Sequence, residues 1–315
     1  MEEHNISPIF IMGAYRSGTT MLASHLAENA QAVSLPEMPF VLDIIESNAA
    51  SVDEIKQLYS QISGQFHFKA SGVSISESDF INLFEESSTP AQRIYKLLQH
   101  HFGFSSTKQK FWIEHTPHNR ERVARYLKVF PNAKFIHIVR DPRAVYASMH
   151  SYIRWNSQDP IAFAKKWTSS ITHGHLAATQ YSDIIKEISY EQYVLNQTAT
   201  LKELCQFSGL SYQPSMNTGN GIKLPEYTLK QHKLVGKAPD ASRIKAWQTT
   251  ISEREAEIIE HECKVWMEYY NISPLSNSTS PATAFEVIIF KMKQRLKMPL
   301  SKLKRLKDNL VTKAQ

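Results

Sequence analysis

The sequence predicts an α/β fold in which helices cover both faces of a parallel sheet, and two observations carry this prediction. Short apolar runs that suit buried strands alternate along the chain with longer segments of helical periodicity. The helical segments also carry end signals, such as Pro142 in a first turn and Gly209 after a last turn. Strands that alternate with helices in this way pair in parallel, because each helix returns the chain to the same edge of the sheet.

The strands and helices follow one another in a regular order. Strands are predicted at residues 9–13, 111–114, 134–139 and 184–189. The first of them is apolar throughout and ends at a glycine, as expected of a strand that is buried on both faces. Helices are predicted at residues 19–28, 120–130, 142–152, 162–181 and 198–207. Residues 40–104 are mostly helical, and we expect them to be an insertion that follows a second short strand.

Composition divides the 315 residues into a body, a linker and a tail. Residues 1–272 carry the alternating pattern and are expected to form one domain. Residues 273–283 are rich in Ser, Pro, Asn and Thr, which is typical of a linker. Residues 284–315 are predicted to form a basic amphipathic helical tail, which opens with capping-box spacing between Thr283 and Glu286.

The formal net charge of +6 comes from the tail. From Lys291 onward the chain holds nine of its 36 basic residues and one of its 30 acidic residues, so residues 1–290 carry a net charge of −2. A body with this charge does not favour nucleic acid as a partner. The tail can be a solvated helix, a helix on an anionic membrane surface or a site for a partner, and the sequence leaves these open.

Composition and cysteine usage bound the class of protein. The chain is 42% hydrophobic, which excludes a wholly disordered protein. It holds no run of about 18 apolar residues and no basic leader, so we expect neither a transmembrane helix nor a signal peptide. The two cysteines, Cys205 and Cys263, do not suggest a disulfide framework or a zinc site. We therefore expect a cytoplasmic protein, which the tail can hold at the inner membrane surface; the oligomeric state stays open.

The loop after the first strand has the form of an anion site. Residues 13–20 (Gly-Ala-Tyr-Arg-Ser-Gly-Thr-Thr) lie where backbone N–H groups and a helix N-terminus bind phosphate. Their spacing matches a nucleotide-binding P-loop, and the predicted sheet is therefore of the P-loop type. Thr19, however, stands where such a loop has lysine, and Arg16 lies inside the loop. The missing lysine argues against a kinase; the alternative is an ordinary turn between strand and helix.

A second candidate anion site follows the strand at 134–139. Arg140 comes at the carboxyl end of this strand, where open α/β sheets bind ligands, and Ser148 lies about two turns along the next helix. An arginine and a hydroxyl can bind a phosphate through charge-assisted hydrogen bonds. The alternative is that Arg140 and Asp141 form only an ion pair at the strand end. Two separate anion sites together indicate a nucleotide with phosphates at both ends.

These motifs resemble those of the PAPS-dependent sulfotransferases, which use 3′-phosphoadenosine 5′-phosphosulfate. Residues 13–20 are similar to the loop that binds 5′-phosphosulfate, and residues 139–148 are similar to the 3′-phosphate motif. Tyr190 stands at the family position that contacts adenine, and Lys237 and Trp247 resemble a carboxyl-terminal cofactor segment.

The resemblance covers roughly residues 8–270, so residues 1–272 look like a sulfotransferase domain, closest in motif style to the tyrosylprotein and carbohydrate enzymes. It implies transfer of a sulfuryl group from PAPS to an acceptor hydroxyl, without a metal ion. It also implies a set of donor-binding residues: Arg16, Ser17, Gly18, Thr19, Thr20, Arg140, Ser148, Tyr190 and Lys237.

Three residues carry the implied catalysis, namely Glu37, Arg16 and His115. Glu37 follows Arg16 by 21 positions, which resembles the spacing of the family's catalytic glutamate, and we expect it to be the general base. His115 stands where many relatives have lysine; a protonated imidazole there would make activity fall above about pH 7. The alternatives are that Glu37 is a solvated acid at a helix start and that His115 only packs at a strand end. Tyr152 replaces an arginine of some relatives, and Arg154 could substitute for it.

The sequence therefore predicts a sulfotransferase that acts on a hydroxyl of a carbohydrate or glycolipid. A tyrosyl or small natural-product acceptor is the alternative of the same class. A P-loop kinase would require magnesium and ATP. The remaining alternative, a nucleotide-binding module that docks on membranes without turnover, has no need of Glu37, Arg16 and Arg140 together.

Overall fold

The sheet of the protein is parallel throughout. The computed structural model describes residues 7–104, 108–150, 159–222, 224, 229, 232, 235–276 and 279–293. Within them, five strands pair in the order β2-β3-β1-β4-β5, and every pairing is parallel. The strands are β1 (Ser7–Gly13), β2 (Ala32–Ser34), β3 (Phe111–Glu114), β4 (Lys134–Val139) and β5 (Ile185–Ser189). The predicted α/β fold with a parallel sheet is confirmed.

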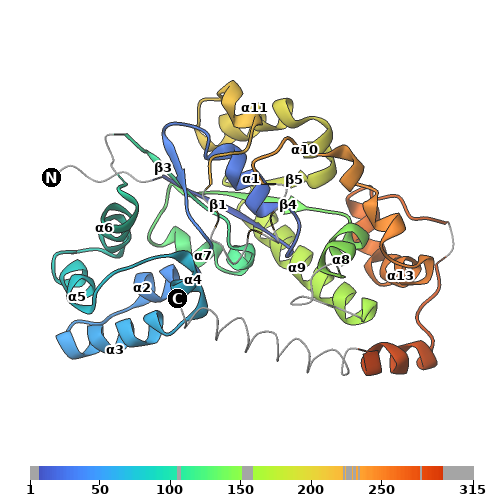
Figure 1. The fold of residues 1–315 in the computed structure, drawn as a ribbon, viewed down its shortest axis with the longest axis horizontal. Helices are drawn as coiled ribbons and strands as arrows, with labels where there is room; N and C mark the ends of the chain where they lie inside the picture. The colour runs from blue at the N-terminus through green and yellow to red at the C-terminus, as the bar shows by residue number, and fades with distance from the viewer. Residues whose placement is uncertain are drawn as a thin grey trace.

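Along the sequence the helices divide into a group before β4 and a group after it (Figure 1 labels them). The first group, which includes the predicted insertion, is α1 (Thr19–Leu26), α2 (Val41–Glu46), α3 (Val52–Ser63), α4 (Phe66–Ser71), α5 (Glu77–Glu85), α6 (Pro90–Phe102) and α7 (Val123–Leu127). The second is α8 (Pro142–His150), α9 (Pro160–Gln180), α10 (Tyr190–Leu195), α11 (Gln197–Ser208) and α13 (Glu253–Tyr269). The 3₁₀ turns are η1 (Pro117–Glu121), η2 (Pro214–Asn217), η3 (Ala241–Arg243) and η4 (Ala246–Thr249).

Helices cover both faces of the sheet, because successive side chains of a strand point to opposite faces. Ile9 and Ile11 of β1 are buried in a core that includes residues of α1, α10 and α11. Phe10 and Met12 of the same strand are buried in a second core with residues of α7 and α9. This double burial accounts for the apolar run that predicted the strand. Helices α2–α6 lie at the end of the molecule opposite α8 and α13 (Figure 1).

The helix predicted at residues 120–130 is wrong in extent. The segment forms η1 and then the short helix α7, and the two meet at Arg122, whose φ of −124° and ψ of 2° are not helical. Tertiary contacts hold the first turn in its tighter form: the Asn119 amide donates to Glu114, and the Arg120 guanidinium donates to Gly13 O. Long-range hydrogen bonds of this kind override local helical propensity.

The carboxyl-terminal segment confirms the expected capping box. The Glu286 N–H donates to Thr283 Oγ1 (3.3 Å), and the Thr283 N–H donates to Glu286 Oε2 (2.8 Å). Residues 284–293 are helical, whereas residues 294–315 of the predicted tail lie outside the described residues. Cys205 and Cys263 are both buried and free. None of the helices described is long and apolar enough to span a bilayer.

Candidate functional site

The loop between β1 and α1 is shaped by two left-handed residues. Arg16 has a φ of 67° and Gly18 a φ of 99°. A Cβ at Gly18 would lie 2.8 Å from the ring of Tyr190, so this position requires glycine for space as well as for conformation. Gly13 approaches β4 as closely, since a Cβ there would lie 2.5 Å from Ile138 O. Such a backbone turns successive N–H groups toward one point, where an anion can bind.

The hydroxyl side chains of the loop are buried at the start of α1. Ser17, Thr19 and Thr20 are all buried. The Ser17 hydroxyl has no hydrogen-bond partner among the described residues. A buried hydroxyl without a partner is costly unless a ligand supplies one, and a phosphate oxygen at a helix N-terminus would do so. These residues therefore fit the phosphate end of a nucleotide.

The two candidate anion motifs meet in space. Arg16 Nε donates to Ser148 Oγ of α8 (3.2 Å), and Arg140 Nη1 donates to Arg16 O (2.9 Å). The Arg140 guanidinium lies over the ring of Tyr190, 4.1 Å from its centroid. Arg140 Nε is buried and has no partner within the described part of the chain, which fits a second anion. The structure thus brings Arg16, Arg140, Ser148 and Tyr190 together.

The ion pair considered for Arg140 is formed by a different arginine. Arg143 Nη2 lies 2.6 Å from Asp141 Oδ2, and Arg143 Nη1 lies 2.5 Å from Glu260 Oε1 of α13. The Arg143 guanidinium also stacks 4.2 Å over Trp247. All four side chains are buried, so this network fixes α8 to α13 and leaves Arg140 for the site.

The remaining predicted donor residue lies apart from this group. The Lys237 side chain is exposed, and its backbone lies near His25 of α1. None of the polar contacts described for residues 235–240 joins Lys237 to Arg16 or Arg140. Tyr152 and Arg154 lie outside the described residues.

Glu37 lies in a desolvated setting beside a second carboxylate. It follows β2 and is only partly exposed. Burial and, to a lesser extent, the negative charge of Glu114 raise the pKa of Glu37, the charge of Arg16 lowers it, and the net result is a pKa of about 7. A carboxylate with a pKa near neutrality is suited to accept a proton at physiological pH. The charges of Glu37 and Arg16 therefore interact, which places the two residues in the same region of the molecule.

Glu114, at the end of β3, is a functional candidate that sequence reasoning missed. Its Oε1 accepts a hydrogen bond from the backbone N–H of Met38 (3.2 Å), the residue after Glu37. The Thr116 N–H and the Thr116 and Asn119 side chains donate to the same carboxylate. In the contacts described, this buried carboxyl group accepts hydrogen bonds from neutral donors. The only sequence signal was an acidic residue at the end of an apolar strand.

His115 is buried beside Glu114 in a setting that disfavours its charged form. Neither ring nitrogen has a hydrogen-bond partner among the described residues. Burial lowers the pKa of His115, although the charge of Glu114 acts in the opposite direction. The structure therefore works against the protonated imidazole that the sequence predicts.

Two further residues near the site had no sequence signal. Arg120 Nη1 donates to Gly13 O (3.0 Å) and to Pro117 O (2.8 Å), and so supports the start of the phosphate loop. His232 is partly buried; burial, the charge of Arg16 and the neighbouring His115 lower its pKa to about 3. The site as a whole joins two candidate anion-binding positions to a carboxyl group with a raised pKa, an arrangement that suits transfer of an anionic group.

Comparison with known proteins gives a consistent result. A model described as "Sulfotransferase family" matches residues 8–214. A curated relative, an uncharacterized protein of Aquifex aeolicus, is 24% identical over 248 residues, which are 76% of this chain. The match spans only 30% of the length of that relative.

Two solved structures share the fold. The sulfotransferase domain of the Synechococcus PCC 7002 olefin synthase has a TM-score of 0.57 and 19% identity, covering 87% of this chain and 98% of that one. The sulfotransferase domain from the curacin biosynthetic pathway has a TM-score of 0.56 and 17% identity, covering 85% and 99%.

Proposed function

The chain belongs to the sulfotransferase family of enzymes, and we propose that it transfers a sulfuryl group from PAPS to a hydroxyl of a carbohydrate or glycolipid. The observation that carries the proposal is the contact between the two anion motifs. Arg140 donates to the backbone of Arg16, and Arg16 donates to Ser148, although these motifs are more than 120 residues apart. A ligand with phosphates at both ends would engage both arginines.

The residues of the chain have separate roles in this proposal. PAPS supplies the sulfonate: its bond to the 5′-phosphate oxygen breaks as the acceptor oxygen bonds to sulfur. Glu37 takes the proton of the acceptor hydroxyl. Arg16 and the N–H groups of residues 13–20 stabilise the negative charge that remains on the leaving phosphate. Arg140 and Ser148 hold the 3′-phosphate, and Tyr190 lies against the nucleoside.

His115 enters this proposal as a neutral group, since burial lowers its pKa. A neutral imidazole donates one hydrogen bond to the transferring sulfonate, without a full charge. Lys237 is kept as a proposed contact to PAPS because it resembles a residue of the family's carboxyl-terminal cofactor segment. No step requires a metal ion in this scheme.

A calorimetric titration tests the donor assignment. We expect PAP, the product nucleotide, to bind at least about tenfold more tightly than ADP, because only PAP carries a 3′-phosphate for Arg140. Turnover with PAPS should persist in EDTA. Equal affinity for PAP and ADP would overturn the assignment, and ATP turnover that depends on magnesium would point to a kinase instead.

The acceptor class is tested separately. Radiolabelled PAPS is incubated with a panel of glycans, glycolipids, tyrosyl peptides and small hydroxylated natural products, and the sulfated product is identified by mass. The proposal expects label in the glycan or glycolipid fraction. Label confined to the peptide or natural-product fraction would replace this acceptor with one of the two alternatives.

A further inference from the structure

Helix 284–293 carries an exposed apolar stripe. Phe285, Ile288 and Met292 have exposed fractions of 71%, 56% and 57%. They are spaced three and four residues apart, so they lie within about 60° of one another around the helix axis. Three large apolar side chains on one face of a short helix are costly in water, which indicates that this face contacts something else.

The rest of the helix is arranged around this stripe. Phe290 is buried on the opposite side of the helix, where Val287 is also partly buried. Lys291 and Lys293 are both exposed, and they fall on the two flanks of the stripe, each about 90–110° from its centre. Lysines that flank an apolar face can extend their ammonium groups to a charged surface while the face itself is buried.

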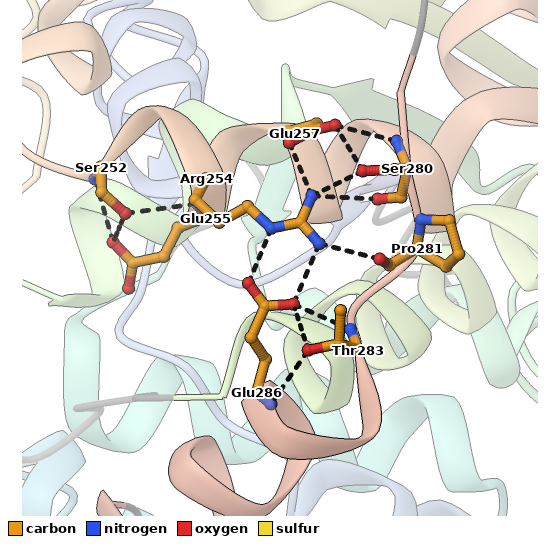
Figure 2. Close-up of polar contacts among 8 residues, drawn as sticks. All are labelled: Ser252, Arg254, Glu255, Glu257, Ser280, Pro281, Thr283 and Glu286. Carbon is orange, nitrogen blue, oxygen red and sulfur yellow. Dashed lines mark hydrogen bonds and ion pairs between the residues drawn. The ribbon is translucent and has the colours of Figure 1, made fainter.

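The helix is joined to the enzyme body by Arg254, near the start of α13 (Figure 2). Arg254 Nε and Nη2 donate to the two carboxylate oxygens of Glu286, at 2.7 and 2.9 Å. Its Nη1 donates to Glu257 Oε2 (2.6 Å) and to Ser280 Oγ (2.9 Å). Nη2 also donates to Pro281 O (2.8 Å).

This cluster orders the segment that leads into the helix. Glu257 Oε1 accepts from both the N–H and the hydroxyl of Ser280, so the preceding residues are held to α13 as well. The hydrogen bonds from Arg254 and Thr283 lower the pKa of Glu286 to about 2, which keeps the bidentate pair charged over the physiological range. The apolar stripe therefore has a defined orientation relative to the enzyme body.

The distribution of charge along the chain indicates which kind of surface this stripe would contact. Residues 291–315 contain nine basic residues and one acidic residue, whereas residues 1–290 have a net charge of −2. An apolar stripe with lysines on its flanks and further basic residues beyond it is typical of helices that lie in the interface of an anionic bilayer.

We propose that helix 284–293 docks the protein on an anionic lipid bilayer, with Phe285, Ile288 and Met292 at the boundary between headgroups and acyl chains. The bidentate ion pair between Arg254 and Glu286 then sets the orientation of the catalytic domain above the membrane. This inference is independent of the sulfotransferase activity, because none of its residues belongs to the donor or acceptor site. The occupant is a lipid surface, not a second protein, because Lys291 and Lys293 flank the stripe and the sequence that follows is strongly basic.

Vesicle sedimentation of the full-length chain tests the proposal. The protein is mixed with vesicles of phosphatidylcholine alone or of phosphatidylcholine with phosphatidylglycerol. We expect binding at least about tenfold stronger to the anionic vesicles, and a loss of that preference in high salt. The triple variant Phe285→Ser/Ile288→Ser/Met292→Ser should bind anionic vesicles about tenfold more weakly, since its apolar contact is lost.

The matched control replaces three exposed apolar residues elsewhere, Val52→Ser/Leu195→Ser/Val265→Ser, and should bind like the wild type. Circular dichroism confirms that both triple variants are folded. Wild-type binding by the stripe variant, or equal binding to neutral and anionic vesicles, would overturn the proposal. So would sedimentation equilibrium that shows a wild-type dimer and a monomeric stripe variant, because the stripe would then join two copies of the chain.

Discussion

The two halves of the candidate site are built from opposite charges. On the donor side, Arg16 and Arg140 join the phosphate loop to the β4–α8 segment. On the acceptor side, Glu37 and Glu114 place two carboxyl groups in buried surroundings, with no lysine or arginine bonded to Glu114 among the contacts described. In the proposed function, the arginines of the donor side would bind an anionic nucleotide, and the buried Glu37, with a pKa of about 7, would accept a proton.

The comparison shows that the two halves differ in the information needed to recognise them. Anion binding depends on a loop and a helix start, which are local features of the sequence. A raised carboxyl pKa depends on burial and on a second charge that the fold brings close. The donor side should therefore respond to mutation in its affinity for nucleotide, and the acceptor side in turnover and in pH dependence.

The largest effect is expected at Glu37. Glu37→Gln keeps the shape of the side chain but removes its ability to accept a proton. We expect kcat to fall by about 10³-fold, within the usual range for loss of a general base. PAP affinity, measured by calorimetry, should stay within about threefold of wild type, because no phosphate contact is lost. Near-normal turnover with intact PAP binding would remove Glu37 from the mechanism.

The donor side contains a matched pair of arginines that separates binding from folding. Arg143→Gln leaves Asp141 and Glu260 buried without their cation, and should cost about 3–5 kcal/mol of unfolding free energy. Arg140→Gln should cost less, about 1–2 kcal/mol, since in the contacts described this guanidinium forms one hydrogen bond, to a carbonyl, and stacks on Tyr190. Chemical denaturation measures both values.

Nucleotide binding then distinguishes the same pair. Arg140→Gln should weaken PAP binding by about 10- to 100-fold and leave ADP binding nearly unchanged, because it removes charge-assisted bonds to the 3′-phosphate. Arg143→Gln, under conditions in which it is folded, should bind PAP normally. An equal loss of PAP and ADP affinity in Arg140→Gln would assign Arg140 to the loop backbone rather than to the 3′-phosphate.

Much of the fold and of the donor side could be predicted from the sequence. The apolar run at 9–13 and the glycines of the following loop have local causes. The sequence also singled out Arg16, Arg140, Ser148 and Tyr190, which the structure brings together, but it did not predict that the two motifs would touch directly. Arg120 was missed, because its partner, Gly13, is 107 residues away in the sequence. Glu114 was missed for the same reason, since its contact with Met38 spans 76 residues.

For the acceptor side, the sequence could identify candidate residues but could not predict their protonation states. For His115 the sequence indicates only a group that titrates near neutrality, because the ordinary pKa of histidine lies close to that range. Only the structure places it in a buried position that lowers this pKa. Likewise, the spacing that singled out Glu37 contains no information on the neighbouring carboxylate of Glu114.

The smallest effect, and the sharpest test of the acceptor side, is a shift in pH dependence. Glu37 accepts a proton only when it is ionised, so kcat/KM should rise with pH through about 7, the raised pKa of Glu37. Glu114→Gln keeps an oxygen that can accept the Met38 N–H but removes the negative charge that raises this pKa. The rising limb should therefore move to lower pH, by about one unit.

The direction of this shift distinguishes the two candidate titrating groups. If a protonated His115 controlled the rate, activity would fall as the pH rises through the lowered pKa of His115, and removal of the Glu114 charge would lower that pKa and move the fall to still lower pH. If activity rises with pH and this rise shifts to lower pH in Glu114→Gln, the titrating group is Glu37. If activity instead falls with pH and this fall shifts to lower pH, the titrating group is His115. The Glu37→Gln variant, assayed at elevated enzyme concentration, should lack the rising limb. A limb that persists in that variant would show that another group accepts the proton, and the contrast between the two halves of the site would then fail on its acceptor side.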